Sequence, residues 1–229
     1  MKSLVPVTAA LLCLAVSGCA TTTAGTAMPA TSAPLTTAET LPSLLLSAAQ
    51  VGSAMSGTDL VVTREVAEPW DDSARLTEGI GCLAVAGAAQ RGVYADTGWT
   101  AVHGQVLREP PPAQWSHFAT QAVVLFPTTA AATDFFERSR DSWAGCSNRE
   151  LAYPQQLAPE QIWSIGPVGV DRDVLAVSRA QRSPQQWSCQ RALTVHANVA
   201  VDVEACSLDG PTSAAAAIAG AIADQLPTS

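Results

Sequence analysis

The sequence has almost no lysine. Lys2 is the one lysine among 229 residues, and it lies in an N-terminal segment that we expect to be removed. The rest of the chain carries 11 arginines against 20 acidic residues, which gives it a net charge of −9. An acidic surface without lysine argues against binding to nucleic acid and against electrostatic attraction to anionic lipid. We therefore expect no nucleic-acid partner, although the charge identifies no other ligand.

The sequence also lacks the motifs of hydrolases and of metal sites. It contains no Gly-x-Ser-x-Gly, and no cysteines at the short paired spacing of a zinc site. The three histidines, His103, His117 and His196, are the only candidate imidazole bases, and their spacing matches no catalytic triad. Asp171 and Asp173 could offer two oxygens to calcium, but no calcium loop surrounds them, so a solvated turn is the better interpretation. These absences favour a non-enzymatic protein without metal or cofactor.

Residues 1–18 have the composition of a lipoprotein signal peptide. Lys2 supplies a minimal positive region, and the apolar run over residues 4–16 is too short to span a bilayer comfortably. The run ends at Val16-Ser17-Gly18-Cys19, which resembles a bacterial lipobox, where the cysteine thiol receives a diacylglyceryl group and becomes the new N-terminus. The alternative is an ordinary secretory signal that happens to end in cysteine. We expect a lipid anchor on Cys19 and a location on the extracytoplasmic face of the cell membrane.

Residues 19–38 contain no charge and are rich in threonine, alanine and proline. Such a segment cannot bury enough apolar surface to order itself. It is therefore predicted to be a tether between the lipidated cysteine and a folded domain, which we place at residues 39–229.

Four cysteines remain in the folded region, and four cysteines allow three pairings. They are Cys82, Cys146, Cys189 and Cys206. Residues 187–206 have the pattern of a β-hairpin with its turn at Ala197-Asn198. This register sets Cys189 opposite Cys206 in a narrow, non-hydrogen-bonded pair, which is within reach of a disulfide, and leaves Cys82 for Cys146. Two disulfides indicate an oxidising, extracytoplasmic compartment.

The same register divides the hairpin into two faces. Val199, Val201 and Val203 fall on one face, which we expect to belong to the core. The charged residues Arg191, Asp202 and Glu204 fall on the other, and we expect that face to be largely exposed to water, as in many antiparallel pairs.

The spacing of apolar residues predicts helices near both ends and in the middle of the folded region. The predicted helices cover residues 41–57, 78–93, 128–143 and 213–226. The predicted strands cover residues 58–66, a pair within 93–107, 118–126, 162–168 and 174–180, followed by the hairpin. Residues 148–159 are expected to be a loop. This order predicts an α+β fold, a single domain with a central, mostly antiparallel sheet packed by helices.

Several landmarks in one order carry a resemblance to a known family. They are Leu41-Pro42-Ser43-Leu44-Leu45-Leu46, Cys82, Val93-Tyr94, Gly98-Trp99, Phe126-Pro127, Phe135-Phe136, Trp143, Cys146, Trp187-Ser188-Cys189-Gln190-Arg191-Ala192, Asn198-Val199, Asp202-Val203 and Cys206. Over residues 41–226 the chain resembles the extracellular sensor domain of a mycobacterial serine/threonine kinase, the PknH-like domain that also occurs in lipoproteins. The resemblance implies an α+β fold, two disulfides with the pairing above, and a V-shaped cleft proposed to bind a ligand.

The tryptophans are the candidates for a ligand site. Trp70, Trp99 and Trp163 could line an apolar cleft, whereas Trp143 and Trp187 lie beside cysteines and are expected to pack against the disulfides. No kinase domain or transmembrane helix is recognisable, so the resemblance implies binding more than signalling across a membrane. We predict a lipoprotein domain that binds a small molecule or a cell-envelope component. The alternatives are a protein–protein interaction module of the cell envelope and, less well supported, an enzyme.

Overall fold

The computed structural model describes residues 35–70, 80–111, 114–153, 160–182 and 186–227. The predicted signal peptide, Cys19 and most of the predicted tether lie outside these residues. Residues 32–229 form one compact unit. Among the described helices, none is both long enough and apolar enough to cross a membrane.

The fold is built on one nine-stranded antiparallel sheet. The strands are β1 (Val61–Val66), β2 (Ala101–Arg108), β3 (His117–Leu125), β4 (Glu150–Tyr153), β5 (Gln161–Ile165), β6 (Gly169–Asp171), β7 (Val174–Arg182), β8 (Ser188–His196) and β9 (Val199–Ser207). Their order across the sheet is β1-β2-β3-β9-β8-β7-β5-β4, and β6 pairs with β7 outside this path. The predicted α+β class with an antiparallel sheet is therefore confirmed.

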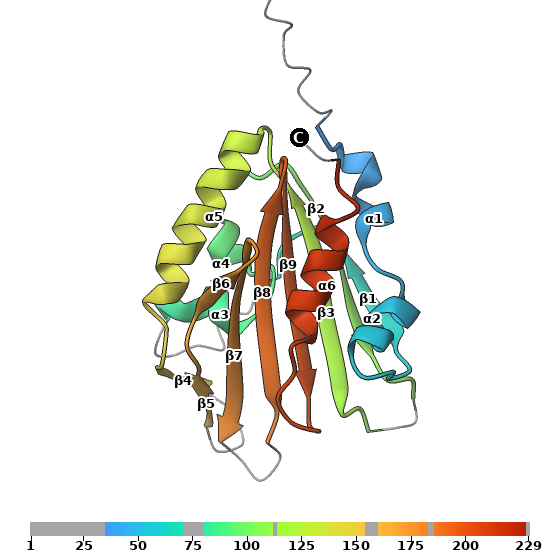
Figure 1. The fold of residues 1–229 in the computed structure, drawn as a ribbon, viewed down its shortest axis with the longest axis vertical. Coiled ribbons are helices and arrows are strands. Elements are labelled where there is room, and N and C mark those ends of the chain that lie inside the picture. Colours follow the sequence, from blue (N-terminus) through green and yellow to red (C-terminus); the bar gives the residue numbers. More distant parts are fainter. Residues whose placement is uncertain (1–34, 71–79, 112–113, 154–159, 183–185, 228–229) are drawn as a thin grey trace, which may run out of the picture. The chain divides into compact units, whose positions relative to one another are not determined.

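Helices cover both faces of the sheet. They are α1 (Leu41–Leu44), α2 (Ala48–Ala54), α3 (Leu83–Ala86), α4 (Arg91–Tyr94), α5 (Thr129–Ala144) and α6 (Ala214–Ala223), with 3-10 turns at η1 (Ala38–Thr40) and η3 (Ile80–Cys82). Helices α6, α1 and α2 enclose one hydrophobic core, and α3, α4 and α5 enclose a second core on the opposite face (Figure 1). Because helices cover both of its faces, the central strand β9 is buried along its whole length.

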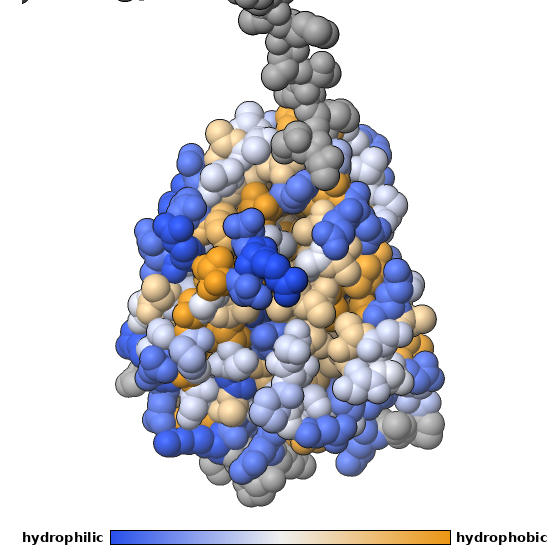
Figure 2. Space-filling model, viewed as in Figure 1, coloured by the Kyte–Doolittle hydropathy of each residue, from blue (hydrophilic) through white to orange (hydrophobic). Residues whose placement is uncertain are grey.

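The face that carries α6 is seen in Figure 2. Hydrophilic side chains follow α5 and the lower end of the view, whereas apolar side chains reach the surface between α5 and α6. Val170 on the short strand β6 is the most exposed large apolar side chain in the described part of the chain. Scattered apolar exposure of this kind is ordinary for a folded protein.

The β8–β9 hairpin has the predicted register, but its charged face is not exposed to water. Cys189 faces Cys206, and Arg191 faces Glu204. Arg191 is 1% exposed, Asp202 2% and Glu204 6%. The prediction of a wet face was wrong because the second core, under α3, α4 and α5, covers these charges and supplies their partners.

Three other predictions from local pattern were also wrong. The helix expected over residues 78–93 is broken, in its described part from residue 80 onward, into η3, α3 and α4. Helix α3 ends at Ala86, Gly87 is extended, and α4 starts only at Arg91. The pair of strands expected within residues 93–107 is a single strand, β2, that follows α4. Part of the loop expected at residues 148–159 forms β4, which pairs with β5. The break between α3 and α4 matters most, because it shapes the site described next.

Candidate functional site

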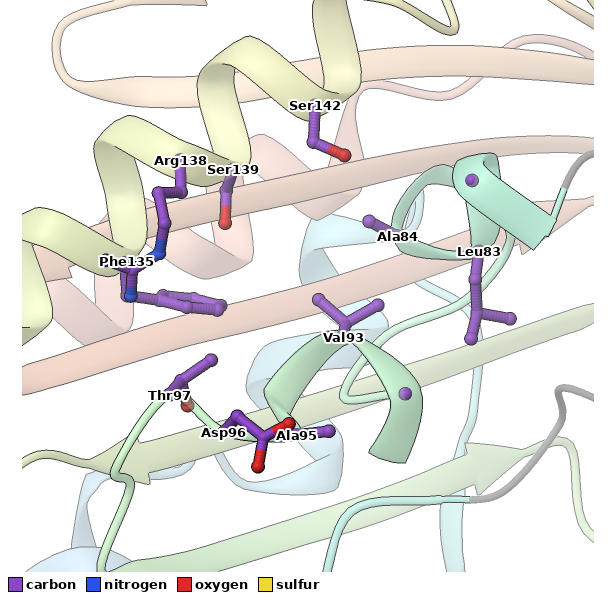
Figure 3. A pocket seen from close by; sticks show the side chains of 12 residues that line it. Leu83, Ala84, Val93, Ala95, Asp96, Thr97, Phe135, Arg138, Ser139 and Ser142 are labelled. Atoms are coloured by element: carbon purple, nitrogen blue, oxygen red, sulfur yellow. The ribbon is translucent and has the colours of Figure 1, made fainter.

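A cavity of about 510 Å³ lies between α5 and the segment that carries α3 and α4 (Figure 3). Its volume is within the range of small-molecule sites in proteins. Five apolar side chains supply much of its lining, and five polar side chains are placed among them. The lining residues are Gly81, Leu83, Ala84, Gly92, Val93, Ala95, Asp96, Thr97, Phe135, Arg138, Ser139 and Ser142. This mixture suits a ligand that is partly apolar and partly polar.

Helix α5 forms one wall of the cavity. Phe135, Arg138, Ser139 and Ser142 are spaced i, i+3, i+4 and i+7, so they share one face of this helix. Thr128 begins the helix as predicted, since its hydroxyl accepts a hydrogen bond from the backbone N–H of Ala131. The sequence predicted this helix, but we did not assign its serines and arginine to a site. Their i, i+3, i+4 and i+7 spacing, which puts them on one helical face, is the sequence feature that could have identified them.

Ser139 is the most informative polar residue in the cavity. It is only 5% exposed, and its side chain points into the cavity between the two walls. No hydrogen-bond partner for its hydroxyl occurs among the described residues. Its oxygen is not among the fully buried side-chain atoms that lack a partner, so it is accessible from the cavity. The open position beside Ser139 can therefore receive a polar group of a ligand.

The opposite wall is formed by α4 and the turn that follows it. Ala95, Asp96 and Thr97 line the cavity there. Asp96 has a φ of 58°, in the left-handed region that aspartate tolerates better than most residues. The hydroxyl of Thr97 donates to the carbonyl of Tyr94 at 2.9 Å, which fixes the turn. Asp96 thus lies on the exposed rim of this wall, across from α5.

A disulfide joins the two walls. Cys82, which immediately precedes α3, is bonded to Cys146, two residues after the end of α5, and their Cα atoms are 5.7 Å apart. Gly81 and Ser142, which line the cavity, lie close to this bond in the chain. The second disulfide joins Cys189 to Cys206 across β8 and β9, with Cα atoms 4.0 Å apart. Both pairings are those expected from the sequence.

A buried ion pair fastens the α3–α4 segment to the sheet. A guanidinium nitrogen of Arg191 lies 2.7 Å from the Asp202 carboxylate and donates to the carbonyl of Ala84 at 3.0 Å. Asp202 also accepts from the backbone N–H of Ala89 at 2.8 Å and from the hydroxyl of Tyr94 at 3.0 Å. Burial, together with the negative charge of Asp202, raises the pKa of Tyr94 well above its usual value. Tyr94 therefore stays protonated and keeps donating.

A second buried pair supports the same segment from the neighbouring strand. Arg179 on β7 pairs with Glu204 on β9 and donates to the hydroxyl of Tyr153 at 2.7 Å. The Tyr153 hydroxyl in turn donates to the carbonyl of Ala86 at 3.1 Å. Burial alone would lower the pKa of the Arg179 guanidinium, but its contacts with Tyr153 and Glu204 outweigh that effect and raise it. These two pairs give the cavity a rigid base, since each of them holds a backbone carbonyl of α3.

The tryptophans proposed for the cleft lie elsewhere. Trp163 is buried beneath the Arg179 guanidinium, which lies 4.5 Å from its ring centroid. Trp70 is half-buried and packs so closely on Gly104 that a Cβ there would lie 2.7 Å from its ring. Trp99 is half-buried two residues before β2. None of the three is among the residues that line the cavity.

The two tryptophans beside cysteines differ in burial. Trp143 is almost fully buried in the core under α5, with the Arg191 guanidinium 5.2 Å from its ring centroid. Trp187 is half-buried and packs against Trp115 and Phe118, with ring centroids 5.2 and 5.6 Å away. Trp143 belongs to the core under α3, α4 and α5, and Trp187 packs against it. That core also contains the four cysteines.

The histidines are not near the cavity lining. His117 lies between two carboxylates, with Nδ1 2.9 Å from Glu109 and Nε2 3.2 Å from Asp209. Burial by itself would raise the pKa of the Glu109 carboxyl, but hydrogen bonds from His117 and Ser116 outweigh it and lower that pKa. His196 is bonded to the carbonyl of Pro227 at 3.0 Å.

The remaining candidates lie on strands or turns of the sheet. His103 is on β2, half-buried. Asp171 and Asp173 lie at the exposed turn between β6 and β7, where Asp171 pairs with Arg172 at 3.5 Å. This arrangement agrees with a solvated turn.

The fold and the cavity define an α+β domain stabilised by two disulfides, a feature typical of domains outside the cytoplasm. Residues 36–225 match the family described as PknH-like extracellular domain, and the chain belongs to this family. Its sequence is 32% identical over 189 residues to the serine/threonine-protein kinase PknH of Mycobacterium bovis, and equally to that of Mycobacterium tuberculosis. These matches cover 82% of this chain but only 31% and 29% of the kinases, so the chain spans about a third of their length.

The similarity extends to a solved structure. The crystal structure of the extracellular domain of PknH from Mycobacterium tuberculosis is similar to this fold, with a TM-score of 0.76 and 31% sequence identity. The similarity covers 84% of this chain and 97% of that domain. The match is thus to the extracellular part of a kinase and not to its catalytic part. An extracytoplasmic location fits both this match and the two disulfides.

Proposed function

We propose that this domain binds a small molecule or a component of the cell envelope in the cavity between α5 and the α3–α4 segment, without catalysing a reaction. The cavity itself carries the proposal. It has the volume of a small-molecule site, apolar side chains in its lining, and the Ser139 hydroxyl facing into it. Its rigid base supports the same role, because a preorganised site loses less entropy when a ligand binds.

The proposal includes attachment to the extracytoplasmic face of the cell membrane through lipid on Cys19. The lipobox-like sequence Val16-Ser17-Gly18-Cys19 and the family membership support this part of the proposal. Two acyl chains on one cysteine give stable anchoring, whereas a single chain binds membranes only marginally. A domain held in this way would sample ligands in the envelope.

The binding proposal is tested by filling the cavity from its rim. Ser142 lines the cavity and is exposed, so Ser142→Trp can place an indole in the mouth without disturbing the core. We expect protein purified gently from membranes of a mycobacterial host to carry a non-covalent small molecule in native mass spectrometry, and the variant to lose it. Thr133→Trp is the matched control, since Thr133 is exposed on the same helix but does not line the cavity. Persistence of the bound molecule in Ser142→Trp, or its absence from the wild type, would contradict the proposal.

A further inference from the structure

The mouth of the cavity carries one cation and one anion that have no ion-pair partners in the described part of the chain. Arg138 projects from α5, and Asp96 lies on the opposite wall after α4; both are exposed (Figure 3). Neither forms an ion pair with the other or with any other described residue. Arg140, two residues further along the same helix and outside the lining, pairs with Glu137 at 2.5 Å. Arg138 and Asp96 are therefore left free to pair with charges on a ligand.

The interior behind this mouth is mostly apolar. Leu83, Val93 and Phe135 point into the cavity, and the Ser139 hydroxyl is the buried polar group among them. Burying an alkyl chain against such a surface is favourable, and the gain grows with each CH₂ group that is removed from water. The interior thus favours a hydrocarbon group, and the hydroxyl accommodates a polar atom near the junction with the head group.

The two mouth charges select among head groups. A purely anionic head group is attracted by Arg138 but repelled by Asp96. A purely cationic head group is attracted by Asp96 but repelled by Arg138. A head that carries both charges gains from both. We propose, resting on the proposed function of this cavity, that its ligand is an amphiphile with a zwitterionic head group, with the anionic centre toward Arg138, the cationic centre toward Asp96 and the apolar chain against Phe135.

The test compares four probes that share an eight-carbon chain and differ in head charge. They are octylphosphocholine (zwitterionic), octanoate (anionic), octylammonium (cationic) and octyl glucoside (neutral), each used below its micelle-forming concentration. Binding to the chain from residue 20 onward is measured by calorimetry. We expect octylphosphocholine to bind about three- to tenfold more tightly than octyl glucoside, because each exposed charge pair contributes little and the chain supplies the rest. The octanoate and octylammonium affinities should fall below that of octylphosphocholine.

Two substitutions assign this preference to the mouth. Arg138→Gln and Asp96→Asn should each remove most of the zwitterion's advantage, while Arg140→Gln, on the same helix and outside the lining, should leave it unchanged. Asparagine tolerates the left-handed backbone of residue 96, so Asp96→Asn changes the charge without straining the turn.

Three outcomes would overturn the inference. If octanoate binds most tightly and Asp96→Asn strengthens it further, the ligand class is anionic, and the proposed binding function stands without the zwitterion. If phosphocholine without a chain binds as tightly as octylphosphocholine, the ligand is a small zwitterion and not an amphiphile. If no probe binds, or if Ser142→Trp leaves the binding of every probe unchanged, the cavity is not the binding site. The proposed function then fails together with the inference.

Discussion

At the scale of single residues, the buried Arg191–Asp202 pair is the point on which the base of the cavity depends. Both side chains are almost fully buried, and Asp202 alone accepts hydrogen bonds from Ala89 and Tyr94. Asp202→Asn leaves the Arg191 charge buried without its counter-charge. We expect a loss of about 3–5 kcal/mol in the free energy of unfolding, measured by urea denaturation, because an uncompensated buried charge is expensive.

The double variant Asp202→Asn/Arg191→Met is the control for this prediction. It removes both charges at similar volume, so it should recover part of the stability lost in Asp202→Asn, and the coupling follows from a double-mutant cycle. Equal stability of Asp202→Asn and the wild type would show that the pair does not hold the α3–α4 segment.

At the scale of elements, the disulfide between the start of α3 and the end of α5 should matter more than the disulfide of the hairpin. Cys82 and Cys146 are 64 residues apart, whereas Cys189 and Cys206 are 17 apart on strands that already pair. In the chain-entropy description, the longer loop gives about 4 kcal/mol and the shorter about 3 kcal/mol. We expect Cys82→Ser/Cys146→Ser to lower the free energy of unfolding more than Cys189→Ser/Cys206→Ser does.

The same pair of variants separates stability from binding. The first disulfide joins the two walls of the cavity, so its removal should also weaken the binding of octyl glucoside in the fraction that is still folded. Neither Cys189 nor Cys206 lines the cavity, so removal of the second disulfide should leave that affinity unchanged. If both variants bind the probe like the wild type, the walls do not depend on the crosslink.

The elements also show which features of the fold could be predicted from the sequence and which could not. The hairpin register followed from alternation and from two cysteines at matching distances from the turn, and both signals are local. The burial of Arg191 and Glu204 could not be predicted in this way, because Glu204 finds its partner Arg179 on β7 and Arg191 binds the carbonyl of Ala84. The cavity was missed for a related reason: apolar spacing predicted one helix over residues 78–93, whereas that segment is broken into η3, α3 and α4, and residues of all three elements line the cavity.

At the scale of the whole molecule, the domain fixes the point where its N-terminal segment departs. The side chain of Asn198, in the β8–β9 turn, is buried. Its oxygen accepts from the backbone N–H of Thr36, and its nitrogen donates to the carbonyls of Thr36 and Phe126, all at 3.0 Å. Sixteen residues separate Cys19 from Thr36. Fully extended, a segment of this length spans at most about 60 Å, so a lipid on Cys19 would keep the cavity close to the membrane surface.

The anchor is tested by comparing the two N-terminal cysteines. Cys19→Ser removes the proposed lipid acceptor, and Cys13→Ser, inside the apolar run, is the matched control. In a mycobacterial host grown with labelled palmitate, we expect Cys19→Ser to lose the label and to leave the membrane fraction, and Cys13→Ser to keep both properties, because two acyl chains are what make anchoring stable. If Cys19→Ser stays labelled in the membrane, or if the wild type is never labelled, residues 1–18 act as an ordinary secretory signal. The cavity would then belong to a domain that diffuses freely, and its ligand would no longer have to come from the membrane surface.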